Sequence, residues 1–197
     1  QAGDDQVLQV MRRGYTSDDY RRLVERIRAT VSGVSLSTDL IVGFPGEREE
    51  AFQRSVEMLR EVQFDKVHAA AYSARDGTIA ARKMSDDVPL DDKRARIKAI
   101  ETLQAEIQAE INTRYRQQTV EVLVEGMKRG IPHGRNRNDK LVYVDGAQDR
   151  LGEVLDVEIN KTGPWSLKGA ATSAADRTQE EPDGYRAQET YDTDHGD

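Results

Sequence analysis

The spacing of apolar residues changes at about residue 118 of the 197-residue chain, and this change constrains the fold more than any other feature. Up to residue 117, apolar side chains recur every three or four positions in segments separated by short β-rich runs, which is typical of alternating helices and strands. From residue 118 they alternate with polar side chains in short runs separated by glycines, as in small antiparallel barrels. We therefore expect an α/β unit over residues 1–117 and an all-β unit over residues 118–171.

The first unit is expected to alternate helices with two strands. Helices are predicted to begin after Asp4, at Thr16 or Ser17, at about Glu47 and at Asp91, the last two running to Val62 and Gln117. Strands are predicted over residues 35–44 and Lys66–Tyr72. Strands that alternate with helices in this way indicate βα units around a parallel sheet or barrel.

The second unit is expected to be a barrel of about 50 residues, which is the size of small OB-like folds. Its strands are predicted around Val120–Val124, Leu141–Val144, Val154–Ile159 and Trp165–Leu167. Residues 172–197 lack apolar periodicity and contain two arginines against eight acidic side chains, so we expect a disordered acidic tail. This tail accounts for most of the net charge of −7, and the acidity of the whole chain is therefore no argument against a nucleic-acid partner for the body.

Composition excludes several kinds of chemistry. The chain contains no cysteine, so it can hold no disulfide, thiol nucleophile or cysteine-ligated cluster of its own. No apolar run approaches the roughly 20 residues of a membrane span, and the polar, acidic start is unlike a signal peptide. We expect a cytoplasmic protein with no membrane partner, and the first residue, Gln1, suggests a piece of a longer polypeptide.

Candidate ligand-binding residues lie along and after the two predicted strands. Backbone N–H groups of the turn that contains Gly43 and Gly46 could receive an anion, although a plain tight turn is the commoner explanation of two such glycines. Asp39 either accepts backbone hydrogen bonds or points to a ligand, and Arg75 either pairs with an anion or is solvated. The full set of candidates is Ser37, Asp39, Gly43, Gly46, Tyr72 and Arg75. The three histidines show no metal-ligand spacing, and we assign no metal ligand and no catalytic residue.

Basic and aromatic residues in the second unit form a candidate RNA-binding set. Basic side chains neutralise phosphates, and aromatic rings stack on unpaired bases. The unit holds eight basic and eight acidic side chains, so the basic residues would occupy one face, and a solvated loop remains an alternative. The candidates are Lys128, Arg135, Arg137, Lys140, Tyr143, Trp165 and Lys168.

Five strings of the chain, in order, resemble the methylthiotransferase family of radical SAM enzymes. They are VLQVMRRGYT, STDLIVGFPGE, YSARDGTIAA, GRNRNDKLVYV and GPWSLKG, within a resemblance that covers about residues 1–171. The most similar branch modifies tRNA, making 2-methylthio derivatives of N6-isopentenyl-type adenosine beside the anticodon.

The resemblance implies a C-terminal piece of such an enzyme. Residues 1–117 would be the end of a partial radical SAM barrel, which is TIM-like, with its closing helix, and residues 118–171 a TRAM domain that binds the anticodon stem-loop. The parent would use S-adenosyl-L-methionine (SAM) and two 4Fe-4S clusters, with the candidates after the strands lining the SAM or substrate mouth. The cluster cysteines would lie in a missing N-terminal part, so this piece alone would be inactive.

Departures from the family pattern leave alternatives open. The family's usual QSGS is Gln1-Ala2-Gly3-Asp4 here, and its Pro-Arg-Pro-Gly-Thr-Pro is residues 74–79, where only Arg75, Gly77 and Thr78 are retained. Arg75 favours the tRNA branch over relatives that methylthiolate a ribosomal protein, which usually have an acidic residue there. A non-catalytic RNA-binding module is a further alternative.

Overall fold

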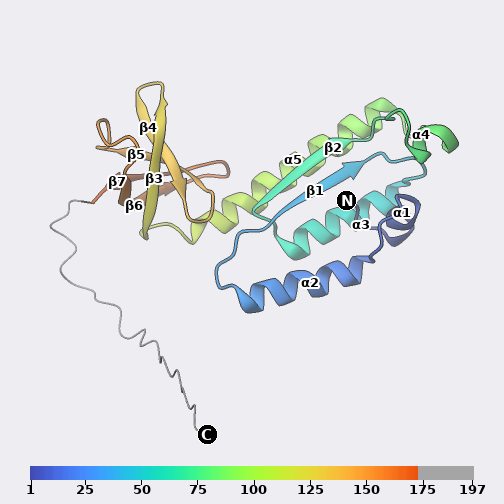
Figure 1. The fold of residues 1–197 in the computed structure, drawn as a ribbon, viewed down its shortest axis with the longest axis horizontal. Coiled ribbons are helices and arrows are strands. Elements are labelled where there is room, and N and C mark those ends of the chain that lie inside the picture. The colour runs from blue at the N-terminus through green and yellow to red at the C-terminus, as the bar shows by residue number, and fades with distance from the viewer. Residues whose placement is uncertain (173–197) are drawn as a thin grey trace, which may run out of the picture.

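The structure, a computed structural model, describes residues 1–172 as two units joined by a long helix (Figure 1). The N-terminal unit contains a pair of strands and several helices, and the C-terminal unit is a β-barrel. The elements of the first unit are α1 (Asp5–Val10), α2 (Ser17–Thr30), β1 (Ser37–Val42), α3 (Glu49–Val62), β2 (Lys66–Ala71), α4 (Ile79–Lys83) and α5 (Leu90–Thr113). The predicted acidic tail begins at residue 172, and its residues 173–197 lie outside the described part of the chain.

The two strands of the N-terminal unit pair in parallel, with Ser37 opposite Lys66 and Val42 opposite Ala71. Their inward side chains, such as Leu40, pack with α2, α3 and α5 in one apolar core that includes Phe64 and Ile100. The opposite face of the sheet is exposed at Ser37, Asp39, Lys66, His68 and Ala70. Parallel sheets are usually covered on both faces. In this sheet, no layer formed by residues 1–172 packs on the exposed face.

Local hydrogen bonds fix the helix ends near most of the predicted positions. The Asp4 carboxylate accepts the N–H of Val7 at 2.9 Å, and Thr16 forms a reciprocal capping box with Asp19 at the start of α2. Several predicted bounds differ from the observed ones by a few residues: β1 is shorter than the predicted 35–44, and α5 ends at Thr113 and is followed by turns. Helix α3 begins at Glu49, because Glu47 turns its side chain inward. The short helix α4, capped by Thr78, was not expected.

The C-terminal unit is a closed five-stranded barrel, which confirms the expectation of a small all-β domain. Its strands follow the spatial order β3-β4-β5-β7-β6 and close between β6 and β3. The barrel is not wholly antiparallel as expected, because β5 and β7 pair in parallel. The strands are β3 (Thr119–Lys128), β4 (Ile131–Asn136), β5 (Leu141–Asp145), β6 (Val154–Thr162) and β7 (Leu167–Ala171).

Alternating valines and other aliphatic residues fill the barrel, as the period of two predicts. Val122, Val142, Val144 and Val157 are fully buried. Trp165, expected in a strand, lies instead in the turn before β7 and is 63% exposed. Strand β4 was missed because it contains Pro132 and Gly134, residues that disfavour strands.

Polar contacts attach the barrel to the N-terminal unit at the amino ends of β1 and β2. The ammonium of Lys140 lies 2.7 Å from the Asp65 carboxylate, and both side chains are largely buried. The Asn138 amide donates to the Gly33 carbonyl at 2.7 Å, and the Asn112 amide of α5 donates to the Gly163 carbonyl at 2.8 Å. The two units are therefore held together by direct contacts as well as by α5.

Candidate strand-end site and nucleic-acid interface

The turn after β1 has its amides engaged by the chain's own carboxylates. The N–H of Gly43 donates to the Glu47 carboxylate, which also pairs with the Arg96 guanidinium at 2.8 Å. Burial raises the pKa of Glu47, and the hydrogen bond from Gly43 and the charge of Arg96 oppose that rise. The Gly46 N–H donates to Asp87 at 2.8 Å. An anionic ligand would have to displace these carboxylates to reach either amide.

Tyr72 lies beside this turn, at the carboxyl ends of both strands. Its N–H donates to the Val42 carbonyl at 2.8 Å, and its ring meets Phe44 edge-on at 5.0 Å between centroids. The Lys93 ammonium lies 5.3 Å from the centre of the Tyr72 ring and 2.6 Å from Asp86. Lys93 also covers the turn, because a Cβ added at Gly43 would lie 2.4 Å from its Cγ. This end of the sheet is therefore a compact polar cluster.

The six strand-end candidates do not all gather there. Gly43, Gly46 and Tyr72 share the carboxyl end, and Arg75 is exposed in the loop that follows β2. Asp39 is exposed midway along β1 rather than buried, and Ser37 lies at the amino end, about 17 Å from the turn at the usual strand rise. The Asp39 carboxylate can accept hydrogen bonds and the Arg75 guanidinium can donate them, and both side chains are exposed.

No group of three or more histidine, aspartate and glutamate side chains within residues 1–172 is placed to hold a metal ion. The sequence offers no cysteine for an iron-sulfur cluster.

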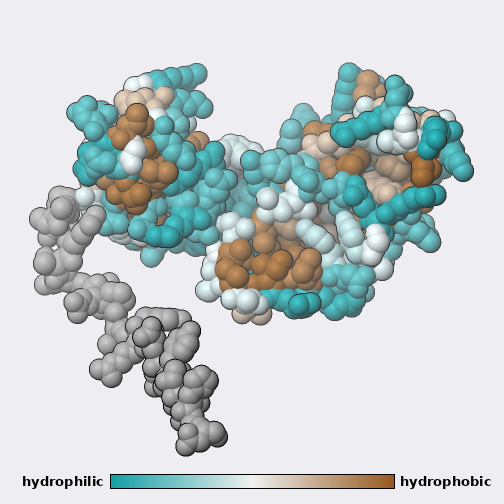
Figure 2. Space-filling model, viewed as in Figure 1, coloured by the Kyte–Doolittle hydropathy of each residue, from teal (hydrophilic) through white to brown (hydrophobic). Residues whose placement is uncertain are grey.

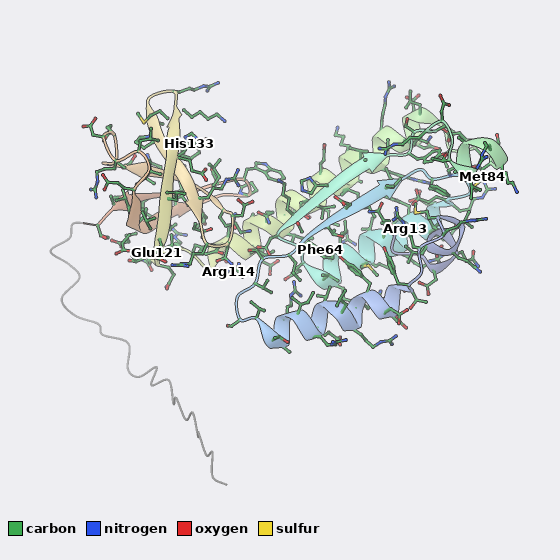
Figure 3. All side chains as sticks on the ribbon, in the orientation of Figure 1. Arg13, Phe64, Met84, Arg114, Glu121 and His133 are labelled. Carbon is green, nitrogen blue, oxygen red and sulfur yellow. The ribbon has the colours of Figure 1, made fainter. Side chains whose placement is uncertain are left out.

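The barrel presents a row of aromatic and basic side chains across three neighbouring strands. His133 of β4 pairs in register with Tyr143 of β5, which pairs with Lys168 of β7. The His133 and Tyr143 rings are 6.2 Å apart, and the Lys168 ammonium is 3.1 Å from Asp145. His133, labelled on the barrel in Figure 3, was not among the candidates. The sequence signal for His133 was its position two residues before Arg135, because residues two apart in a strand lie on the same face.

The two arginines of the candidate set are exposed but paired. Arg135 lies 3.3 Å from Asp139 and 4.0 Å from Glu125, and Arg137 pairs with Glu121, which raises the pKa of its guanidinium. Such exposed ion pairs contribute little to stability, and a guanidinium can donate to a phosphate as well as to a carboxylate. Lys128 is exposed beside the turn between β3 and β4.

Lys140 is the exception in the set. Its ammonium is buried and pairs with Asp65 of the other unit, so it ties the two units together and is not open to phosphate in this arrangement. The candidate RNA surface is therefore formed by the remaining residues: Lys128, Arg135, Arg137, Tyr143, Trp165 and Lys168, with His133 added.

The strand-end cluster and the RNA surface lie at opposite ends of the molecule. Met84, which packs with Phe44 and Tyr72, marks the far end of the N-terminal unit in Figure 3, whereas His133 is on the barrel.

Hydrophilic residues cover much of the view of both units, interrupted by apolar patches (Figure 2). No described helix has the length and apolar character needed to cross a membrane.

Comparison with known proteins agrees with this division of the chain. Residues 113–172 match the model of the TRAM domain, and these residues contain the whole barrel. Proteins named tRNA-2-methylthio-N(6)-dimethylallyladenosine synthase match most of the chain. The protein of Dehalococcoides mccartyi strain CBDB1 is 46% identical over 85% of this chain, and that of Herpetosiphon aurantiacus is 48% identical over 86%. This chain is similar to these synthases over most of its length.

This relationship confirms the resemblance seen in the sequence strings. The synthase of the same name from Geobacillus thermodenitrificans is also similar, at 39% identity over 89% of the chain. The chain covers 40%, 39% and 34% of the length of these three relatives. A solved multidomain protein with nucleic acid binding domains from Streptococcus pneumoniae aligns with a TM-score of 0.25 over 30% of the chain, too slight a likeness to carry an argument.

Proposed function

We propose that this chain supplies the RNA-binding domain and part of the SAM-binding domain of a tRNA methylthiotransferase. The observation that carries the proposal is the row His133, Tyr143 and Lys168 on a barrel that matches the TRAM domain. A tyrosine ring between an imidazole ring and an ammonium group suits an unpaired RNA segment, because rings stack on bases and cations hold phosphates. The relatives are named for a reaction on tRNA, and tRNA carries the bases and phosphates that such a surface would bind.

The N-terminal unit is proposed to be the last part of a radical SAM barrel. Its parallel β1-α3-β2 arrangement and its uncovered sheet face support this, because a closed barrel would place that face toward the interior. Asp39, Tyr72 and Arg75 would contact SAM, and the Gly43 and Gly46 amides would join them if Glu47 and Asp87 moved away. Ser37 would contribute from the opposite end of β1.

The proposed reaction of the complete enzyme adds a methylthio group to C2 of an N6-isopentenyl-type adenosine beside the anticodon. Bound SAM and iron-sulfur clusters would supply the radical and sulfur chemistry, and cysteines outside this sequence would hold the clusters. The residues of this chain would bind the RNA and orient SAM.

The RNA-binding half of the proposal is tested by measuring binding of an unmodified anticodon stem-loop across a salt series. We expect salt-dependent binding of the original chain and weaker binding of the Arg135→Ala/Arg137→Ala variant. Losing two phosphate contacts to a single strand should reduce the slope of log K against log salt by about 1.4. Alanine avoids placing new acids beside Glu121 and Glu125.

The matched control is Arg94→Ala, which removes an exposed arginine paired with Asp91 on α5, away from the barrel surface. This variant should bind like the original chain. If the stem-loop does not bind, or if affinity and salt slope are the same in all three proteins, the barrel face is not the RNA surface.

A further inference from the structure

A cleft of about 610 Å³ lies where the barrel meets the N-terminal unit. One wall is the amino-terminal part of β2, which has no strand partner on the side away from β1 in the described chain, together with α5. The other wall contains Arg135, Asn138 and Trp165 of the barrel. In Figure 1, α5 runs behind β2 and leads into the barrel along this junction. The volume is within the range of about 300–1,000 Å³ typical of small-molecule pockets.

Three residues that line the cleft each carry a buried side-chain oxygen that has no hydrogen-bond partner within residues 1–172. These oxygens are the Ser35 hydroxyl and the side-chain carbonyl oxygens of Gln104 and Asn112. The amide nitrogens of Gln104 and Asn112 donate to Phe64 and Gly163, which fixes both carbonyl oxygens as the free atoms. Gln104 is 4% exposed and Asn112 is 1% exposed. Buried acceptors without donors are costly, so these oxygens are suited to a ligand that carries N–H or O–H groups.

The mouth of the same cleft carries the chemistry that holds a nucleotide. Trp165 is 63% exposed there, which leaves its indole face available for stacking. The lining holds three cationic side chains, and because the Lys140 ammonium is paired with Asp65, Arg135 and Lys66 are the two that could hold a phosphate. Arg135 already belongs to the candidate RNA surface. A stacking ring beside cations and acceptors is the combination that proteins use for unpaired bases.

We propose that this cleft binds one unpaired nucleotide of the RNA held by the barrel. Its base stacks on Trp165, its amino group donates to the free oxygen of either Gln104 or Asn112, and its phosphate contacts Arg135 or Lys66. The assignment rests on the proposed function, because it needs RNA on the barrel. It extends the RNA site from the barrel surface to residues of α5 and to the segment before β1.

Trp165 is the only tryptophan, so tryptophan fluorescence reports on this residue at the mouth of the cleft. The complete chain is titrated with an anticodon stem-loop and with a duplex of the same length that has no unpaired loop. We expect saturable quenching by the stem-loop and little by the duplex. Replacing the loop adenosines with purine ribonucleoside, which lacks the amino group, should weaken binding several-fold.

The Trp165→Ala variant, followed by a labelled stem-loop, should bind at least about 5-fold more weakly, whereas Trp165→Phe should keep most of the affinity. Leu151→Ala is the matched control, since Leu151 is equally exposed on the barrel but does not line the cleft. Salt-dependent RNA binding with unchanged Trp165 fluorescence would overturn the cleft assignment and leave RNA binding by the barrel intact. Absence of RNA binding would overturn both, and equal quenching by polyglutamate would mean that the cleft accepts anions without recognising a base.

Discussion

Replacing Lys140 with methionine should weaken the junction between the two units. The Lys140 ammonium and Asp65 carboxylate are 2.7 Å apart, and their side chains are only 8% and 11% exposed. Methionine keeps the length of the side chain but removes the charge, which leaves the Asp65 carboxylate buried without its nearest cation.

The structure sets the size of the effect. Removing one partner of a buried ion pair generally costs about 3–5 kcal/mol. Asp65 still accepts a hydrogen bond from the Leu36 N–H at 2.9 Å and lies 3.6 Å from the Arg114 guanidinium. These two contacts compensate part of the charge that loses its partner. We therefore expect Lys140→Met to lower the free energy of unfolding by about 2–3 kcal/mol.

Two optical signals separate the units during urea unfolding. Ellipticity at 222 nm follows the helices, which all lie in the N-terminal unit of the described chain, and fluorescence follows Trp165 on the barrel. Lys140→Met should separate the two transitions. In a cycle with Asp65→Asn, the double variant should recover at least about 1 kcal/mol relative to the sum of the single changes.

Lys128→Met is the matched control, because Lys128 is an exposed lysine of the same barrel. It should change stability by less than about 0.5 kcal/mol. If Lys140→Met is no more destabilised than this control, and the cycle shows no coupling, the ion pair does not join the units.

Two further predictions concern α2 and the barrel. Hydrogen bonds from the Thr16 N–H and hydroxyl, and the neighbouring Arg22, lower the pKa of Asp19 to about 2. The stabilisation from ionised Asp19 should therefore be full above its ordinary pKa and lost as pH falls toward 2. Thermal melts of Asp19→Asn should show a lower Tm than the original chain at pH 7 and the same Tm near pH 2, and a constant difference would contradict this cause. Gly134→Ala should cost at least about 3 kcal/mol, because its Cβ would lie 1.8 Å from the Leu123 carbonyl oxygen of the neighbouring strand. Gly130→Ala, at an open but left-handed turn position, should cost less in the same fluorescence-monitored melt.

Patterns carried by a single segment were predictable from the sequence. The alternation of Val120, Val122 and Val124 gives β3, and the acids before Val7 give the cap of α1, because both depend on residues close together in the chain. Strand β4 was not predictable in this way, since Gly134 is required by the close approach of Leu123 from the neighbouring strand.

The candidate residues that were misplaced depend on distant partners. Lys140 was grouped with Arg135 because they are close in sequence, but its direction is set by Asp65, which is 75 residues away. The glycine turn was expected to offer free amides, whereas Glu47 folds back onto Gly43 while Arg96 of α5 holds it there. An acid so soon after a glycine turn was the local sign that the chain could satisfy these amides itself.

The attachment of the barrel at the amino ends of β1 and β2 has a geometric consequence. The strand-end cluster at Tyr72 lies beyond the other end of strands that are six residues long, or about 20 Å. With Lys140, Asn138 and Asn112 fixing the junction, the offset between the two places is set by the fold. Under the proposed function, an RNA bound to the barrel would present to the strand-end cluster only the nucleotide that lies at this fixed distance from the bound segment.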